Sequence, residues 1–94
     1  MITFQISGYL TEYTGGRAEI KIDGSSSTVG EALNHLWRAH VGLRDRVLTE
    51  QGQVRPHVNI FVNSETVKRD QVLKAAFSGD GEICIMPAVS GGSL

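Results

Sequence analysis

Two adjacent glycines, Gly91 and Gly92, stand near the end of the printed chain, where they add no side chain to a hydrophobic core. Glycine loses more backbone entropy on ordering than any other residue, so such a pair indicates a function rather than a packing role. A segment without side chains can pass through an opening that excludes other residues. We therefore interpret residues 88–94 as a tail that enters a partner protein, with the carboxylate of Gly92 as the group that reacts.

The tail follows an apolar, strand-like segment at residues 82–86, which Pro87 ends because proline has no amide hydrogen to donate to a sheet. From Pro87 to Gly92 an extended chain reaches ~20 Å, at ~3.3–3.6 Å per residue. This length would place Gly92 inside a partner's pocket while the folded body docks outside. The sequence thus predicts a folded domain over residues 1–87 and a flexible tail over residues 88–94.

The composition predicts one small globular domain that works with other proteins. The chain has 94 residues, of which 40% are hydrophobic, enough for a single modest core. Its net charge of -1 argues against nucleic acid as the main partner, because a basic face would be needed to release counterions. We expect neither a secretion signal nor a membrane span, since the N-terminal segment is polar by its third residue and no long apolar run follows. The single cysteine, Cys84, cannot form an internal disulfide, which favours a cytoplasmic location.

Alternation of apolar and polar side chains predicts the strands of a half-buried sheet. Residues 1–10 and 17–23 both alternate in this way, and the glycines between them allow a tight turn that would join an antiparallel hairpin. Further strands are predicted at residues 58–62, 66–67 and 82–86.

A main helix is predicted to begin at Thr28, because Thr28-Val29-Gly30-Glu31 has the form of a capping box. The Thr28 hydroxyl would accept a hydrogen bond from the Glu31 amide, and the Glu31 carboxylate would accept one from the Thr28 amide. Gly42 is the predicted stop. Residues 43–48 are predicted as a short second helix, and residues 72–77 as a helical turn that fills the core. The main helix would bury one apolar stripe, formed by Val29, Ala32, Leu33, Leu36 and Trp37.

The order of these elements is strand, strand, helix, strand, short elements, strand. If the first and last strands are both central, they pair in parallel and the helix crosses one face of the sheet. The predicted fold class is therefore α+β, with a mixed sheet of four to five strands and one main helix packed on one face. This arrangement is the ubiquitin-like β-grasp.

Five motifs resemble the MoaD/ThiS family of sulfur carriers, and the resemblance covers nearly the whole chain. The first is Leu10-Thr11-Glu12-Tyr13-Thr14-Gly15, which departs from the family in having Thr11 where an arginine is often found. The others are the helix start Thr28-Val29-Gly30-Glu31-Ala32-Leu33, the strand and turn Val58-Asn59-Ile60-Phe61-Val62-Asn63, the turn Gly79-Asp80-Gly81-Glu82-Ile83, and the ending Met86-Pro87-Ala88-Val89-Ser90-Gly91-Gly92. A Gly-Gly pair alone would be weak evidence, but the pair after this strand and turn is specific.

The resemblance implies that an E1-like adenylyltransferase uses ATP to convert the Gly92 carboxylate into an acyl adenylate. Sulfur from a donor then displaces AMP, and the resulting thiocarboxylate supplies sulfur to a biosynthetic enzyme. The chain would be a protein co-substrate rather than an enzyme and would bind no cofactor or metal itself. The longer middle region, residues 43–58, is most similar to the subgroup that serves cysteine biosynthesis, while molybdopterin and thiamine pathways stay open. One alternative is a ubiquitin-like modifier joined through Gly92 to target lysines, and another is a non-reactive binding module.

The chain departs from the mature family members because Ser93 and Leu94 follow Gly92. Some relatives are made with such an extension, which a JAMM-type zinc metalloprotease removes, so cleavage is expected between Gly92 and Ser93. A remnant of expression is the alternative explanation for these two residues.

The expected docking surface is the face of the sheet away from the helix. If Ile60 and Ile85 point into the core, then Phe61 and Met86 point outward and form an exposed apolar patch. The alternative is that loops or residues 68–77 cover this face. The residues predicted to contact a partner are Phe61, Met86, Pro87, Ala88, Val89, Ser90 and Gly91.

Overall fold

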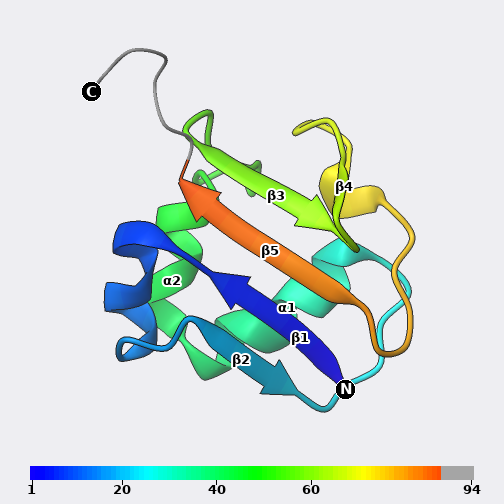
Figure 1. Ribbon diagram of the computed structural model, residues 1–94. Helices are drawn as coiled ribbons and strands as arrows, with labels where there is room; N and C mark the ends of the chain where they lie inside the picture. The colour runs from blue at the N-terminus through cyan, green and yellow to red at the C-terminus, as the bar shows by residue number, and fades with distance from the viewer. Residues whose placement is uncertain (88–94) are drawn as a thin grey trace.

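A mixed five-stranded sheet with two α-helices on one face forms the body of the computed structural model, which describes residues 1–87 (Figure 1). The strands are β1 (Ile2–Ile6), β2 (Glu19–Ile22), β3 (Val58–Val62), β4 (Glu65–Thr66) and β5 (Glu82–Pro87). The helices are α1 (Val29–Ala39) and α2 (Val41–Val47), with short 3₁₀ helices η1 (Gly8–Thr14) and η2 (Val72–Lys74). The order across the sheet is β2-β1-β5-β3-β4.

The first and last strands lie at the centre of the sheet and pair in parallel, as the sequence predicted. In this pair Phe4 lies opposite Ile83 and Ile6 opposite Ile85. The predicted antiparallel hairpin of β1 and β2 is also confirmed, and β5 pairs with β3 on its other side. The α+β class and the ubiquitin-like β-grasp are therefore confirmed.

The first strand is shorter than predicted, because residues 8–14 form η1 rather than strand and turn. Gly8 has a φ of +65°, a left-handed conformation that an extended strand excludes. η1 ends at Gly15, which has a φ of +69° and whose amide donates to the Thr11 carbonyl oxygen. The connection between β1 and β2 is thus a folded element rather than a tight turn.

Helix α1 begins at the predicted cap, although one half of the capping box differs. The Glu31 amide donates to the Thr28 hydroxyl oxygen over 3.2 Å, as expected. The Glu31 carboxylate accepts from the amide of Ser27 at 2.7 Å and from its hydroxyl at 2.9 Å, one residue earlier than predicted. These hydrogen bonds stabilise the ionised carboxylate and lower the pKa of Glu31.

Replacement of Thr28 tests this cap. We expect Thr28→Ala to lower the free energy of unfolding by about 1 kcal/mol, because an orphan amide at the helix start loses its acceptor. Urea denaturation followed by circular dichroism measures the change. The matched control is Ser25→Ala in the exposed connector, which should change stability by less than about 0.5 kcal/mol. Equal losses in the two variants would contradict a capping role for Thr28.

The predicted helix stop at Gly42 is wrong. Helix α1 ends at Ala39, and His40, with φ −136° and ψ 80°, separates it from α2. Gly42 lies inside α2, where its backbone is helical rather than left-handed. The second helix predicted at residues 43–48 is confirmed, with its start moved forward to Val41.

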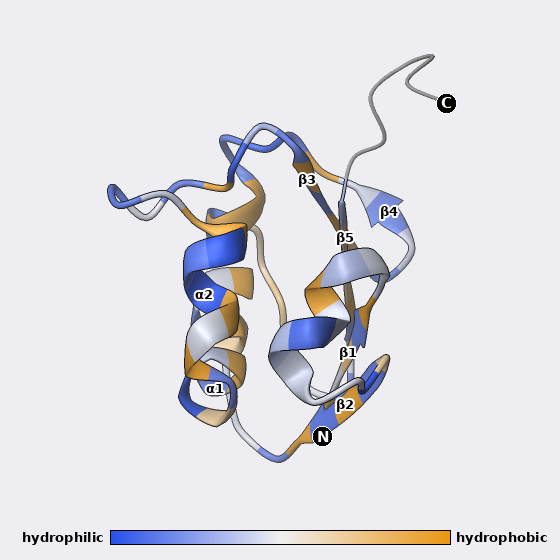
Figure 2. Cartoon of the chain, turned by 90° about the vertical axis from the view of Figure 1, so that its left-hand side faces the viewer, coloured by the Kyte–Doolittle hydropathy of each residue, from blue (hydrophilic) through white to orange (hydrophobic). Residues whose placement is uncertain are grey.

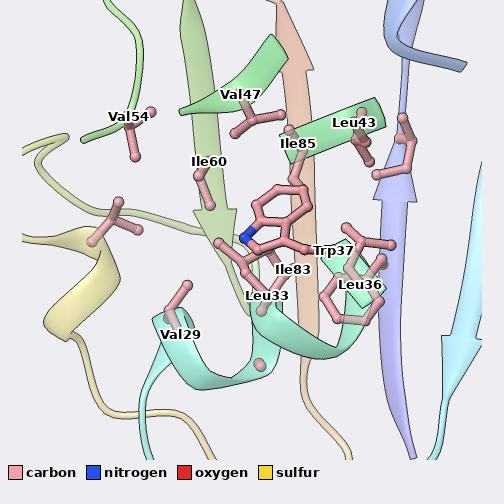
Figure 3. Close-up of a cluster of buried hydrophobic side chains, with 14 of the residues drawn as sticks. Val29, Leu33, Leu36, Trp37, Leu43, Val47, Val54, Ile60, Ile83 and Ile85 are labelled. Atoms are coloured by element: carbon pink, nitrogen blue, oxygen red, sulfur yellow. The ribbon is translucent and has the colours of Figure 1, made fainter. Parts of the chain in front are cut away.

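The core lies between the inner face of the sheet and the two helices. All five residues of the predicted α1 stripe are buried, and Val72 of η2 is buried in the same core. Figure 3 shows Leu33 and Trp37 of α1 directed into the space between helix and strands, into which Ile60, Ile83 and Ile85 also point. Of the residues predicted to fill the core from the segment 72–77, Val72 and Phe77 are buried, while Ala76 is exposed. In residues 1–87 there is no helix with the length and hydrophobicity needed to cross a membrane.

Candidate functional site

Among residues 1–87, no α-helix covers one of the two faces of the sheet (Figure 2). Figures 1 and 2 show α1 and α2 on the same side of the strands, and we call the opposite side the open face. Strands β3 and β5 bury every second residue, including Ile60 and Ile85. Their alternate residues therefore point to the open face, half-buried between neighbouring side chains, and these are Asn59, Phe61, Cys84 and Met86.

The strand register brings the apolar members of this set together. Phe61 lies directly opposite Cys84, and Asn59 lies opposite Met86. Phe61 and Met86 are therefore diagonal neighbours, a spacing of about 7–8 Å that an aromatic ring can bridge. We call Phe61, Cys84 and Met86 the open-face patch. The outward orientation of Phe61 and Met86 agrees with the prediction, but the predicted exposed patch is wrong in one respect, because both side chains are half-buried rather than exposed. Their contact with a partner stays a prediction.

The segment 72–77 does not cover the patch. Its backbone is bonded on the helix side, where the Val29 amide donates to the Ala75 carbonyl oxygen at 3.0 Å and the Phe77 amide to that of Ser27 at 3.1 Å. The bridge between Thr28 and Ala76 fixes it at the same place. For residues 72–77 the alternative of a covered face is wrong. Lys68 and Arg69, from the same predicted segment 68–77, line a hollow together with Phe61.

A polar group borders the patch on the side of β1 and β2. The Gln5 side-chain amide donates to a carboxylate oxygen of Glu19 at 2.9 Å and to one of Glu82 at 3.4 Å. Sequence reasoning missed this group, although strand alternation already put Gln5 and Glu19 on one face of the hairpin. The open face thus joins an apolar area on β3 and β5 to two carboxylates beside it.

Cys84 is the reactive side chain nearest the patch, and its surroundings favour the neutral thiol. Partial burial raises its pKa, and the negative charge of Glu82 raises it further. The thiol donates to a Glu82 carboxylate oxygen at 3.8 Å. A neutral thiol is a poor nucleophile, which favours a packing role for Cys84. In the part of the chain that the structure describes, no three potential metal ligands lie together.

The patch lies next to Pro87, the last residue that the structure describes. Pro87 is the last residue of β5, directly after Met86, and pairs with Val58 at the start of β3. Predicted site residues beyond it, from Ala88 through Gly92 to Ser93, lie outside the described residues, so their roles stay predictions. The open-face patch therefore lies beside Pro87, after which the tail residues begin in the sequence.

Fold and site together define a small ubiquitin-like β-grasp protein in which, over residues 1–87, the helices cover one face of the sheet. The model of the ThiS family matches residues 4–92, nearly the whole sequence. The chain belongs to the ThiS family.

Similar proteins of known type fall into two groups. Small archaeal modifier protein 1 of Haloferax volcanii is 37% identical over 84 residues, which cover 88% of this chain and 91% of the relative. The sulfur carrier protein CysO of Mycobacterium tuberculosis is 30% identical over 93 residues, covering 97% and 98%. The crystal structure of the Amycolatopsis orientalis BexX/CysO complex contains a chain with a TM-score of 0.83 and 29% identity, with 98% and 100% covered. These similarities support a sulfur carrier or a ubiquitin-like modifier.

Proposed function

We propose that this protein is a sulfur carrier whose reactive group is the C-terminal carboxylate of Gly92, exposed after removal of Ser93 and Leu94. The observation that carries the proposal is the Gly91-Gly92 pair a few residues beyond Pro87, where the central strand β5 ends beside the open-face patch. A partner that docks on this patch would find the tail beginning at the edge of its contact surface.

The proposed chemistry takes place on partner enzymes. An E1-like adenylyltransferase brings the Gly92 carboxylate to ATP, and the carboxylate oxygen attacks the α-phosphorus while pyrophosphate leaves. The terminal sulfur of a persulfide then attacks the carbonyl carbon and AMP leaves. A thiol cleaves the resulting acyl disulfide and releases the thiocarboxylate. The folded domain supplies recognition, and the tail supplies the reacting group.

The receiving enzyme is proposed to belong to a cysteine-type pathway. CysO proteins align with almost the full length of this chain, including the longer middle region between α1 and β3. The relative from Amycolatopsis orientalis forms a complex with BexX, which is a precedent for another protein binding a carrier of this shape. A JAMM-type protease is the proposed agent that cleaves after Gly92.

Protein modification is the second candidate, and the similarity to small archaeal modifier protein 1 favours it. In that function the adenylate is the same, but the Gly92 carbonyl carbon is finally attacked by a lysine amine of a target protein. The product would be an isopeptide bond instead of a thiocarboxylate. The two functions therefore differ in the nucleophile rather than in the carrier.

Intact mass of the product distinguishes these functions. The chain ending at Gly92 is incubated with the E1-like enzyme of its own organism, magnesium ATP and a persulfide donor with excess thiol. We expect a mass increase equal to the exchange of one oxygen for one sulfur. The control is the chain that keeps Ser93 and Leu94, which should gain no sulfur because the Gly92 carbonyl is in a peptide bond.

Other outcomes of the same work contradict the proposal. If the chain ending at Gly92 forms no adenylate, both candidate functions fail. If the chain recovered from its own cells carries no sulfur, and peptides of other proteins carry Gly-Gly on lysine, the modifier is supported instead.

A further inference from the structure

The ring of Pro87 is packed against a residue that has no side chain. Gly8 begins η1 with a φ of +65°. A Cβ added there would lie 2.8 Å from Cγ of Pro87 and 3.1 Å from its Cδ, closer than carbon atoms approach without a shift. A proline ring cannot rotate away as a flexible side chain does, because it is closed on the backbone. The Pro87 ring thus occupies space that any L-residue at position 8 would need.

Pro87 is held on both sides of its strand. On one side it pairs with Val58 of β3. On the other, the Ser7 amide donates to the Ile85 carbonyl oxygen at 3.2 Å, which ties the end of β1 to β5 immediately before Pro87. The Gly8 carbonyl oxygen accepts a hydrogen bond from the Thr11 hydroxyl at 3.0 Å, which stabilises the first turn of η1. In Figure 1, the coil that follows β1 lies near the arrowhead of β5.

We propose that Gly8 is a positioning residue for the tail, since it leaves room for Pro87 to sit in the sheet and so fixes the place of the Pro87 Cα–C bond, after which the tail begins in sequence. The inference rests on the proposed function, in which Gly92 must meet ATP in a partner's active site. Proline fixes φ near −65°, so seating the ring also fixes the position and direction of the Pro87 Cα–C bond. A displaced ring would turn the start of the tail relative to the open-face patch on which the partner docks.

The chain offers a matched control at Gly15, at the other end of η1. Gly15 has nearly the same φ, +69°, but an added Cβ there would meet no atom of residues 1–87 within 4 Å. Alanine at either position bears the same left-handed strain, whereas only alanine at position 8 meets Pro87. A difference between the two variants therefore isolates the contact with Pro87 from the strain in the backbone.

The experiment measures ATP–pyrophosphate exchange by the E1-like enzyme with chains ending at Gly92. We expect Gly8→Ala to lower kcat about ten-fold or more relative to Gly15→Ala, because an active site loses much of its rate when reacting groups are misplaced by about 1 Å. The KM for the carrier should stay nearly constant, because the open-face patch is unchanged. Urea denaturation of each variant checks that both remain folded under assay conditions.

A second substitution provides the rescue. Pro87→Ala removes the ring atoms that Gly8→Ala meets, so the chain with both substitutions should return to the kcat of Pro87→Ala alone. Should Gly8→Ala fail to fold, this last comparison still tests the contact. Equal kcat values for Gly8→Ala and Gly15→Ala, or a doubly substituted chain far below Pro87→Ala, would overturn the inference. A wild-type chain that supports no exchange would instead refute the proposed function.

Discussion

Phe4→Ala is expected to lower the free energy of unfolding by about 3–5 kcal/mol, the range for loss of a buried aromatic ring. Phe4 is fully buried in β1, between Ile20 of β2 and Ile83 of β5, at the centre of the inner sheet face. The surrounding strands cannot collapse into the space, because β1 is hydrogen-bonded on both edges. Since small domains are stable by only about 5–15 kcal/mol, the variant should be close to unfolding. Urea denaturation at fixed temperature measures the loss.

The neighbouring residue Thr3 is the control for this prediction. It lies on the same strand but points to the open face, where it is only half-buried. Thr3→Ala should change the free energy of unfolding by less than about 1 kcal/mol, the whole span of strand propensities. If Phe4→Ala cost no more than Thr3→Ala, the placement of β1 at the centre of the core would be incorrect.

The alternation of apolar and polar side chains was sufficient to predict most of the strands and which of their residues face the core. Buried residues of β1, β3 and β5 occupy every second position, so inner and outer faces were readable before any pairing was known. The prediction of where β1 ends was wrong, because the apolar pattern continues past the point at which the backbone leaves the extended conformation. Leu10 continues the apolar pattern of β1, yet the left-handed backbone of Gly8 ends the strand.

The failure at Gly42 has a tertiary cause. A glycine after an apolar stripe usually marks the end of a helix. Here Leu43 and Val47 are both fully buried, and their burial favours a second helix whose first turn includes Gly42. That contribution comes from the packed core, which a local pattern does not contain.

Some features of the candidate site could be predicted from the sequence and others could not. The outward orientation of Phe61 and Met86 follows from alternation within each strand, so it could be predicted. The pairing of Phe61 with Cys84 and the packing of Gly8 on Pro87 join segments far apart in the chain. Both depend on strand register, which single-strand periodicity does not determine. The chemistry of Gly92 still rests on sequence and family, and stays a prediction.

Phe61→Asp is expected to weaken binding to the E1-like partner by about 30-fold or more, the scale of losing an aromatic hot spot worth about 2 kcal/mol or more. The prediction rests on the proposed function. Phe61 supplies the largest side chain of the open-face patch, beside Cys84 and diagonal to Met86. A carboxylate there would lose apolar contact area and would be desolvated without a partner charge on docking. Isothermal titration calorimetry with the chain ending at Gly92 measures Kd.

Thr3→Asp is the matched control, because it puts the same charge on the same face outside the patch. Thr3 lies opposite Lys21 on β2 and Glu82 on β5. Its substitution should change Kd by less than about three-fold, as is usual for charges at an interface rim. Both variants should keep the wild-type circular dichroism spectrum. Equal weakening by the two aspartates would mean that the partner responds to added negative charge anywhere on the open face, and Phe61 would then not be a docking residue.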